Sequence, residues 1–300
     1  MTKQKFSRDI QEKVAVRLGA EYEVRLQTVQ KNNGVQLQGM VILNKLQNVS
    51  PTIYLDDFYE AYCNGYLIER IVEEILRIYR EDTPKENVDM SFFLDFESVK
   101  ERICYRLIDE RQNRELLEKI PHIKYLDLAI CFYYSYQSEQ LGNGSILIYH
   151  THLAMWGVTE QELLRLAHEN TPRLFPWQCN SMENVLDELV GDCYLSQEEK
   201  TAFFRDVPMN VLTNSAKTFG ASCILYPGVL EQVALELQSG FYILPSSVHE
   251  VILLCDGCGE SEPELKNMIK EVNRTQLEAV DVLSYSLYYY SLIKKQIEIL

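Results

Sequence analysis

The stretch that says most about the fold is Gly240-Phe-Tyr-Ile-Leu-Pro-Ser-Ser-Val-His-Glu-Val-Ile-Leu-Leu254. Its two apolar runs, Phe241 to Leu244 and Val251 to Leu254, have the length and composition of buried strands. Between them lies a compact polar insert made of Pro245, Ser246, Ser247, His249 and Glu250. We expect two core strands here, joined by an insert that is either a functional site or an ordinary strand-to-strand corner.

The segments on either side of this stretch predict further strands and helices. Strands are predicted over Asn210–Thr213 and Ala221–Tyr226, and a helix over Val229–Leu237 ends before Gly240. After the stretch, helices are predicted over Glu262–Val272 and from Asp281 to Ile299. This order predicts an α+β fold, with a mixed or antiparallel sheet built from strand-strand-helix units and flanked by helices.

The N-terminal part shows its own periodic patterns. Apolar residues recur every four positions from Phe6 to Leu18, which is typical of an amphipathic helix. Alternating runs flank Asn33-Gly34, a strong signal for a hairpin turn. A long helix is predicted from Asp56 to Glu81, because apolar residues follow helical spacing there.

The middle of the chain predicts strands over Ile103–Ile108, Leu126–Ser135 and Ser145–Met155. Thr159 and Glu162 have the spacing of a capping box, so a helix is predicted from Glu160 to Asn170. Residues 172–208 look irregular apart from a helix over 182–189. We therefore expect one unit over residues 1–300, or two lobes, 1–172 and 205–300, joined by the irregular segment.

Charge, apolar segments and cysteine positions indicate which partners to expect and in which cellular compartment the protein occurs. The formal net charge is -15, which repels phosphate backbones, so we expect no nucleic-acid partner. No signal peptide and no apolar run of membrane-spanning length are found, so we expect a cytoplasmic protein with no membrane partner. The eight cysteines are scattered, mostly in apolar runs, which favours reduced core thiols over disulfides.

The polar insert offers hydroxyls, an imidazole and a carboxylate. A hydrolase-like enzyme using Ser246, Ser247, His249 and Glu250 is one interpretation, with Asn214 or Asn273 brought in by the fold. Catalytic partners usually come from distant parts of a chain, and no Gly-x-Ser-x-Gly elbow is present. The other interpretations are a ligand or partner contact and a purely structural turn.

Two further motifs have structural explanations. His150 and His152 would share one face of the predicted strand, a spacing that can hold a metal, but they lack enough nearby ligands. Cys255 and Cys258 form a CxxC without a second pair for zinc and without a helix starting at the motif. No glycine-rich phosphate motif is found either, so we assign no metal and no cofactor.

Several motifs carry a resemblance to a known family. They are Asn210-Val-Leu-Thr-Asn214, Gly220-Ala-Ser-Cys-Ile-Leu-Tyr226, Ile243-Leu-Pro-Ser-Ser-Val-His-Glu-Val-Ile252, Glu271-Val-Asn273, and the segments 116–132 and 159–172. The chain resembles a bacterial domain-of-unknown-function family that occurs mostly in anaerobic Firmicutes. The resemblance covers most of the chain and implies one continuous unit in a bacterial cytoplasm. It implies no activity and makes no residue catalytic.

The sequence therefore favours a soluble cytoplasmic protein that binds an unknown protein or small molecule without catalysis. The hydrolase-like enzyme is the alternative. The residues expected at a ligand or partner contact are Asn214, Ser246, Ser247, His249, Glu250 and Asn273.

Overall fold

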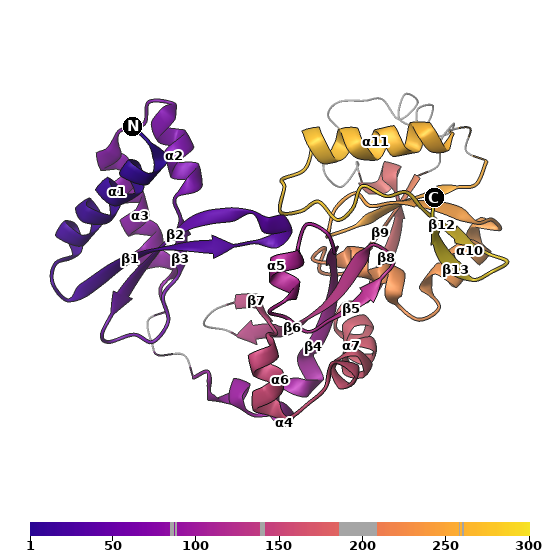
Figure 1. The fold of residues 1–300 in the computed structure, drawn as a ribbon, viewed down its shortest axis with the longest axis horizontal. Helices are drawn as coiled ribbons and strands as arrows, with labels where there is room; N and C mark the ends of the chain where they lie inside the picture. Colours follow the sequence, from indigo (N-terminus) through magenta and orange to yellow (C-terminus); the bar gives the residue numbers. More distant parts are fainter. Residues whose placement is uncertain (85–86, 88, 139–141, 186–208, 258, 260) are drawn as a thin grey trace. The chain divides into compact units, whose positions relative to one another are not determined.

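The computed structural model describes residues 1–84, 87, 89–138, 142–185, 209–257, 259 and 261–300 (Figure 1). The chain divides into two compact units. Unit 1 comprises Met1–Phe92 and Gln137–Gly144, and unit 2 comprises Phe93–Tyr136 and Ser145–Leu300. The expectation from the sequence, one unit over 1–300 or two lobes, 1–172 and 205–300, stays a prediction. Residues 186–189 of the helix predicted over 182–189 lie outside the described part.

Unit 1 pairs a three-stranded antiparallel sheet with helices. The strands, in the order β1-β2-β3, are β1 (Tyr22–Gln30), β2 (Gln36–Asn44) and β3 (Thr52–Tyr54). The helices are α1 (Lys3–Leu18), α2 (Asp56–Cys63) and α3 (Ile68–Asp82). The core of the unit includes Phe6 and Ile10 of α1, Met40 of β2 and Ile75 of α3. These apolar positions repeat at helical and strand spacing, which is why the predicted first helix and hairpin are found.

The helix predicted over Asp56–Glu81 is in fact two helices. α2 ends at Cys63, and Gly65 follows with a φ of 95°, a left-handed conformation that favours glycine. The apolar spacing continues on both sides of this break, so the pattern alone did not mark it.

Two sheets form the framework of unit 2. The first has the order β4-β6-β5 and pairs β6 with a further strand, β7. These strands are β4 (Ile103–Asp109), β5 (His122–Tyr125), β6 (Leu128–Ser138) and β7 (Gly142–Leu147). The second is six-stranded, in the order β13-β12-β10-β11-β9-β8. Its strands are β8 (Trp177–Ser181), β9 (Met209–Asn214), β10 (Phe241–Leu244), β11 (Val251–Cys255), β12 (Tyr288–Ser291) and β13 (Gln296–Ile299).

The described part of unit 2 also contains six α-helices. They are α4 (Phe96–Val99), α5 (Arg114–Leu117), α6 (His150–Trp156), α7 (Glu160–Leu174), α10 (Val229–Leu237) and α11 (Glu262–Thr275). Figure 1 shows α11 lying across one face of the six-stranded sheet, where Leu265 and Ile269 pack against Leu244 and Leu254. The two apolar runs of residues 240–254 pair antiparallel as β10 and β11 at the centre of this sheet. The predicted α+β fold is confirmed, and the strand pairing is antiparallel.

Three predicted elements are wrong. The segment Ala221–Tyr226 is not a strand: it lies in the 3-10 helix η5 (Gly220–Leu225) and its capping residue Tyr226. A short buried apolar run has no period that separates a helix from a strand. The segment 281–299 contains the hairpin β12–β13, over residues 288–299, instead of a helix, and its run of tyrosines suits a strand. Most of the strand predicted over Ser145–Met155 is replaced by α6. Helix α7 also continues past Pro172 to Leu174.

Candidate functional site

Asn214 closes a tight turn at the end of β9. Its Oδ1 accepts hydrogen bonds from the amides of Ala216 (3.1 Å) and Thr218 (3.3 Å). Its Nδ2 donates to the Thr218 carbonyl at 2.9 Å. An asparagine that bonds to backbone two and four residues ahead fixes the path of the turn. Asn214 is buried, so its role in the structure is to orient the chain that enters Phe219.

Phe219 has an unusual backbone conformation. Its φ of 54° and ψ of 25° lie in the left-handed region, which bulky residues rarely occupy. Its amide donates to Nδ1 of His249 at 3.2 Å, and its ring stacks with the imidazole at 5.9 Å between centroids and 12° between planes. The surrounding structure thus holds a strained residue in place against His249.

Gly220 is required by a close approach of two backbone segments. A Cβ at this position would lie 2.2 Å from Thr213 Oγ1, 2.5 Å from the His249 carbonyl oxygen and 2.7 Å from the Asn214 amide nitrogen. Such distances are far inside contact range, so only glycine lets β9 and the His249 turn meet here. Because the two segments lie so close, Thr213 Oγ1 donates a hydrogen bond to the His249 carbonyl at 2.8 Å.

The polar insert forms a turn with its own hydrogen bonds. Ser247 Oγ accepts from the His249 amide at 3.0 Å, and the Ser247 amide donates to the Glu250 carbonyl at 3.1 Å. The Val248 amide donates to the Asp281 carbonyl at 2.8 Å. Ser247 is buried, whereas Ser246, His249 and Glu250 are half-buried. The backbone of the insert is therefore fixed, and the partly exposed side chains remain at its surface.

Both ring nitrogens of His249 have partners. Nδ1 accepts from the Phe219 amide, and Nε2 lies 3.4 Å from Asp281 Oδ1, with each of these two side chains 35% exposed. A nitrogen that accepts a backbone N–H carries no proton itself, so the hydrogen bonds assign the proton of the neutral ring to Nε2. In this arrangement no lone pair of the ring is free to take a proton from a serine hydroxyl.

Arg106, which sequence reasoning missed, completes the surroundings of Phe219. It lies in β4, and its guanidinium carbon is 4.8 Å from the centre of the Phe219 ring. The ring of Tyr133 meets the same phenylalanine edge-on at 5.3 Å. The sequence signal for Arg106 was its position inside the apolar run 103–108. Arginine rarely lies in a buried strand without a partner, so a charged residue there indicates a special role. We call Arg106, Thr213, Phe219, Ser247, His249 and Asp281 the His249 corner.

Asn273 lies on α11 and has a different set of neighbours. Its Nδ2 donates to the Ser284 carbonyl at 2.9 Å, while its buried Oδ1 has no hydrogen-bond partner in the described residues. Ser284 Oγ in turn donates to Asp127 Oδ2 at 3.1 Å. Asn273 thus anchors the segment that carries Asp281. Within the described residues, its side chain makes no hydrogen bond to another predicted site residue.

The two histidines considered for a metal lie on a helix. In α6, His150 and His152 are two positions apart and point to different sides. His152 Nδ1 accepts from the Tyr149 amide at 3.1 Å, and its ring packs against Phe93 at 5.1 Å. Within the described residues no cluster of three or more His, Cys, Asp or Glu side chains could hold a metal. Cys258 of the CxxC lies outside the described part.

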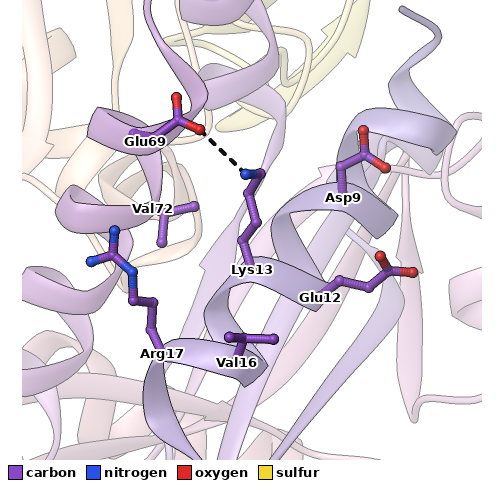
Figure 2. A pocket seen from close by; sticks show the side chains of 7 residues that line it. All are labelled: Asp9, Glu12, Lys13, Val16, Arg17, Glu69 and Val72. Atoms are coloured by element: carbon purple, nitrogen blue, oxygen red, sulfur yellow. Dashed lines mark hydrogen bonds and ion pairs between the residues drawn. The ribbon is translucent and has the colours of Figure 1, made fainter.

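A separate hollow of 490 Å³ opens on unit 1 between α1 and α3 (Figure 2). Lys13 reaches across it to Glu69 with a nitrogen–oxygen distance of 3.2 Å. Its other lining side chains are Asp9, Glu12, Val16, Arg17 and Val72. Figure 2 shows acidic and basic side chains side by side in the lining, which is typical of a solvated helix surface. None of the predicted site residues lies in it.

Comparison with known proteins gives a family. A model described as "Family of unknown function (DUF5688)" matches residues 3–292. The chain belongs to this family. The DUF5688 match spans both compact units and includes every residue of the His249 corner. No curated protein and no solved structure matches the chain. In the described part of the chain, no helix combines the length and the apolar character that crossing a membrane requires.

Proposed function

We propose that the protein is a cytoplasmic binding protein and that its ligand or partner contacts the His249 corner. The observation that carries the proposal is the state of His249, whose two ring nitrogens are both engaged. A serine hydrolase needs a histidine nitrogen that accepts the serine proton. Here the Phe219 amide occupies Nδ1, and Ser247 Oγ is bonded to the His249 amide instead of the ring.

The half-buried side chains of the polar insert, which carries His249, support a contact role. Ser246, His249 and Glu250 keep part of their surface in solvent on a turn whose backbone is hydrogen-bonded. A turn whose backbone is already fixed loses little backbone entropy when a ligand binds. Asn214 and Asn273 support the corner from inside, because each bonds to the backbone of a segment that enters it.

A cytoplasmic location is part of the same proposal. Cys104, Cys131 and Cys223 are buried thiols without a disulfide, and burial raises the pKa of each to about 12. Protonated buried thiols behave as small apolar groups and suit a reducing compartment. Fractionation of cells that express the full chain is expected to place it with cytoplasmic markers, and recovery in an exported fraction would contradict this location.

The test separates binding from turnover in one sample. The full chain is dialysed against a mixture of metabolites, and mass spectrometry follows every compound on both sides. We expect a compound that concentrates with the protein and is released on denaturation with its mass unchanged. Consumption of a compound with appearance of a hydrolysis product would overturn the proposal, provided that the turnover is lost in H249N and S247A.

H249N is the matched variant for this test. The asparagine Oδ1 can take the place of Nδ1 as acceptor for the Phe219 amide, but it cannot reach Asp281 as Nε2 does. The turn should therefore keep its fold while the exposed ring is lost. We expect retention of the bound compound to weaken in H249N and to stay unchanged in E271A, a substitution of an exposed residue on α11.

A further inference from the structure

In the described part of the chain, Arg106 has no anionic partner. Its Nε is buried and has no hydrogen-bond partner, and no carboxylate pairs with the guanidinium within the described residues. Buried arginines are normally paired, because an uncompensated charge in a low-dielectric site costs several kcal/mol. The residue as a whole is half-buried, and burial is the main influence on its guanidinium.

The neighbours of the guanidinium are neutral or aromatic. Its ionisable neighbours are Cys131, Tyr133 and Tyr149, and burial raises the pKa of the Cys131 thiol to about 12. Burial also lowers the pKa of Arg106 and raises the pKa of Tyr133, so the surroundings favour neutral groups. Phe219 offers a cation–π contact at 4.8 Å, which stabilises the charge without neutralising it.

We propose that Arg106 binds the carboxylate of a ligand at the His249 corner. This inference rests on the proposed function and names the chemistry that the corner recognises. A guanidinium presents a planar fork of donors that matches the two oxygens of a carboxylate. Phe219 and the partly exposed Tyr149 supply apolar surface beside it for the rest of the ligand.

The charge balance favours a carboxylate over a phosphate. Arg106 supplies one positive charge, which a singly charged carboxylate neutralises. A phosphate monoester carries about two negative charges at neutral pH. The corner also contains Asp281, and the whole chain has a net charge of -15, so the second charge would be repelled.

The experiment uses the full chain and four small probes at equal ionic strength: acetate, benzoate, benzamide and inorganic phosphate. Benzamide has the shape of benzoate without its charge, and so serves as the matched control. We expect acetate or benzoate to raise the melting temperature and to shift the Arg106 Nε–H resonance in NMR spectra. R106M should weaken the Kd of that probe by about 30-fold or more, and R106K by about tenfold.

R106M has a second expected signature. Without ligand it should melt at the same temperature as the wild-type protein or higher, because an apolar side chain replaces an unpaired buried charge. R106K keeps the positive charge, so the Kd of the probes can still be compared with the wild-type protein if R106M does not fold. A residue needed only for packing would instead lower the melting temperature when changed and leave the Kd of the probes untouched.

A pair of matched peptides, one with a free C-terminal carboxylate and one amidated, identifies the source of the group. Binding of acetate or benzoate points to a small carboxylic acid, and binding of the free peptide alone points to a partner protein. The inference is overturned if no carboxylate probe binds, if benzamide or phosphate binds as well as benzoate, or if R106M binds normally. A compound retained by the wild-type protein and by R106M alike would leave the proposed function standing while this inference fails.

Discussion

At the scale of single residues, Gly220 and Phe219 determine how the predicted site residues meet. The sequence drew attention to Asn214, Ser247 and His249, but it gave no reason for them to be close. The structure joins them because Phe219 adopts a left-handed conformation and Gly220 lets β9 approach the His249 turn. Whether these residues bind a ligand stays a prediction. Their proximity depends on a long-range backbone contact that no local pattern records.

Gly220 provides a direct test of this contact. G220A should destabilise the protein by about 1–3 kcal/mol or more, because the new Cβ meets two backbone atoms within 2.7 Å. The control is G144A, since a Cβ at Gly144 meets nothing within 4 Å and should change stability by less than about 0.5 kcal/mol. Urea unfolding measures both, and equal midpoints for the two variants would contradict the account.

His168 gives a prediction about pH. Its ring packs edge-on against Tyr105 at 5.3 Å, and burial lowers its pKa below the ordinary value. The unfolded chain then takes up a proton near pH 6.5 while the folded chain does not. This contribution to stability is present above about pH 6.5 and is lost as the pH falls. The wild-type urea midpoint should therefore drop more between pH 7.5 and 5.5 than that of H168Q, and equal drops would refute this.

At the scale of elements, apolar periodicity predicted the helices and strands whose apolar residues follow a regular spacing. It missed the elements whose conformation depends on tertiary pairing. Apolar spacing, together with end signals such as Thr159 before α7, predicted most of the regular elements. They are the first helix, the first hairpin, β4, α7, β9, α10, α11 and the pair β10–β11. η5, α6 and the hairpin β12–β13 were not predicted, because their short apolar runs suit either helix or strand. Tertiary pairing decides such segments, as the antiparallel pairing of β12 with β10 shows.

One amide side chain of helix α7 bonds to two backbone carbonyls of the neighbouring segment. Asn170 is buried, and its Nδ2 donates to the carbonyls of Lys100 (2.8 Å) and Ile103 (3.1 Å). N170A leaves both carbonyls without this donor and should cost about 1–3 kcal/mol. The adjacent Glu169 is exposed and bonds only along the helix to Arg165, so E169A should cost less than about 0.5 kcal/mol. Thermal or urea unfolding of the pair measures the difference, and similar losses would argue against the anchor.

At the scale of the whole molecule, the chain has two compact units although its composition is uniform. The buried apolar cluster that contains Ile75 draws all its members from Met1–Phe92. One family model nevertheless matches both units over residues 3–292. Composition and linkers therefore gave no signal for the division, which arises from the pattern of contacts alone.

The division predicts a local response to a core mutation. I75A removes a fully buried side chain of α3 and should destabilise unit 1 by about 2–5 kcal/mol. Hydrogen exchange is expected to accelerate in α1, α3 and β2, and to stay unchanged in β9, β10 and β11. L253A, in the buried centre of β11, should give the converse pattern. A uniform acceleration over the whole chain in either variant would show that the two units do not open separately.

His249 has both ring nitrogens engaged, and we propose that it belongs to a contact surface instead of a catalytic relay. Long-range ¹H–¹⁵N NMR of the imidazole nitrogens tests it most directly, and H249N assigns the signal among only five histidines. At pH 8 we predict a single tautomer, with the proton on Nε2 and Nδ1 accepting a hydrogen bond. A proton on Nδ1, with Nε2 left as a free base, would contradict the account and favour the hydrolase.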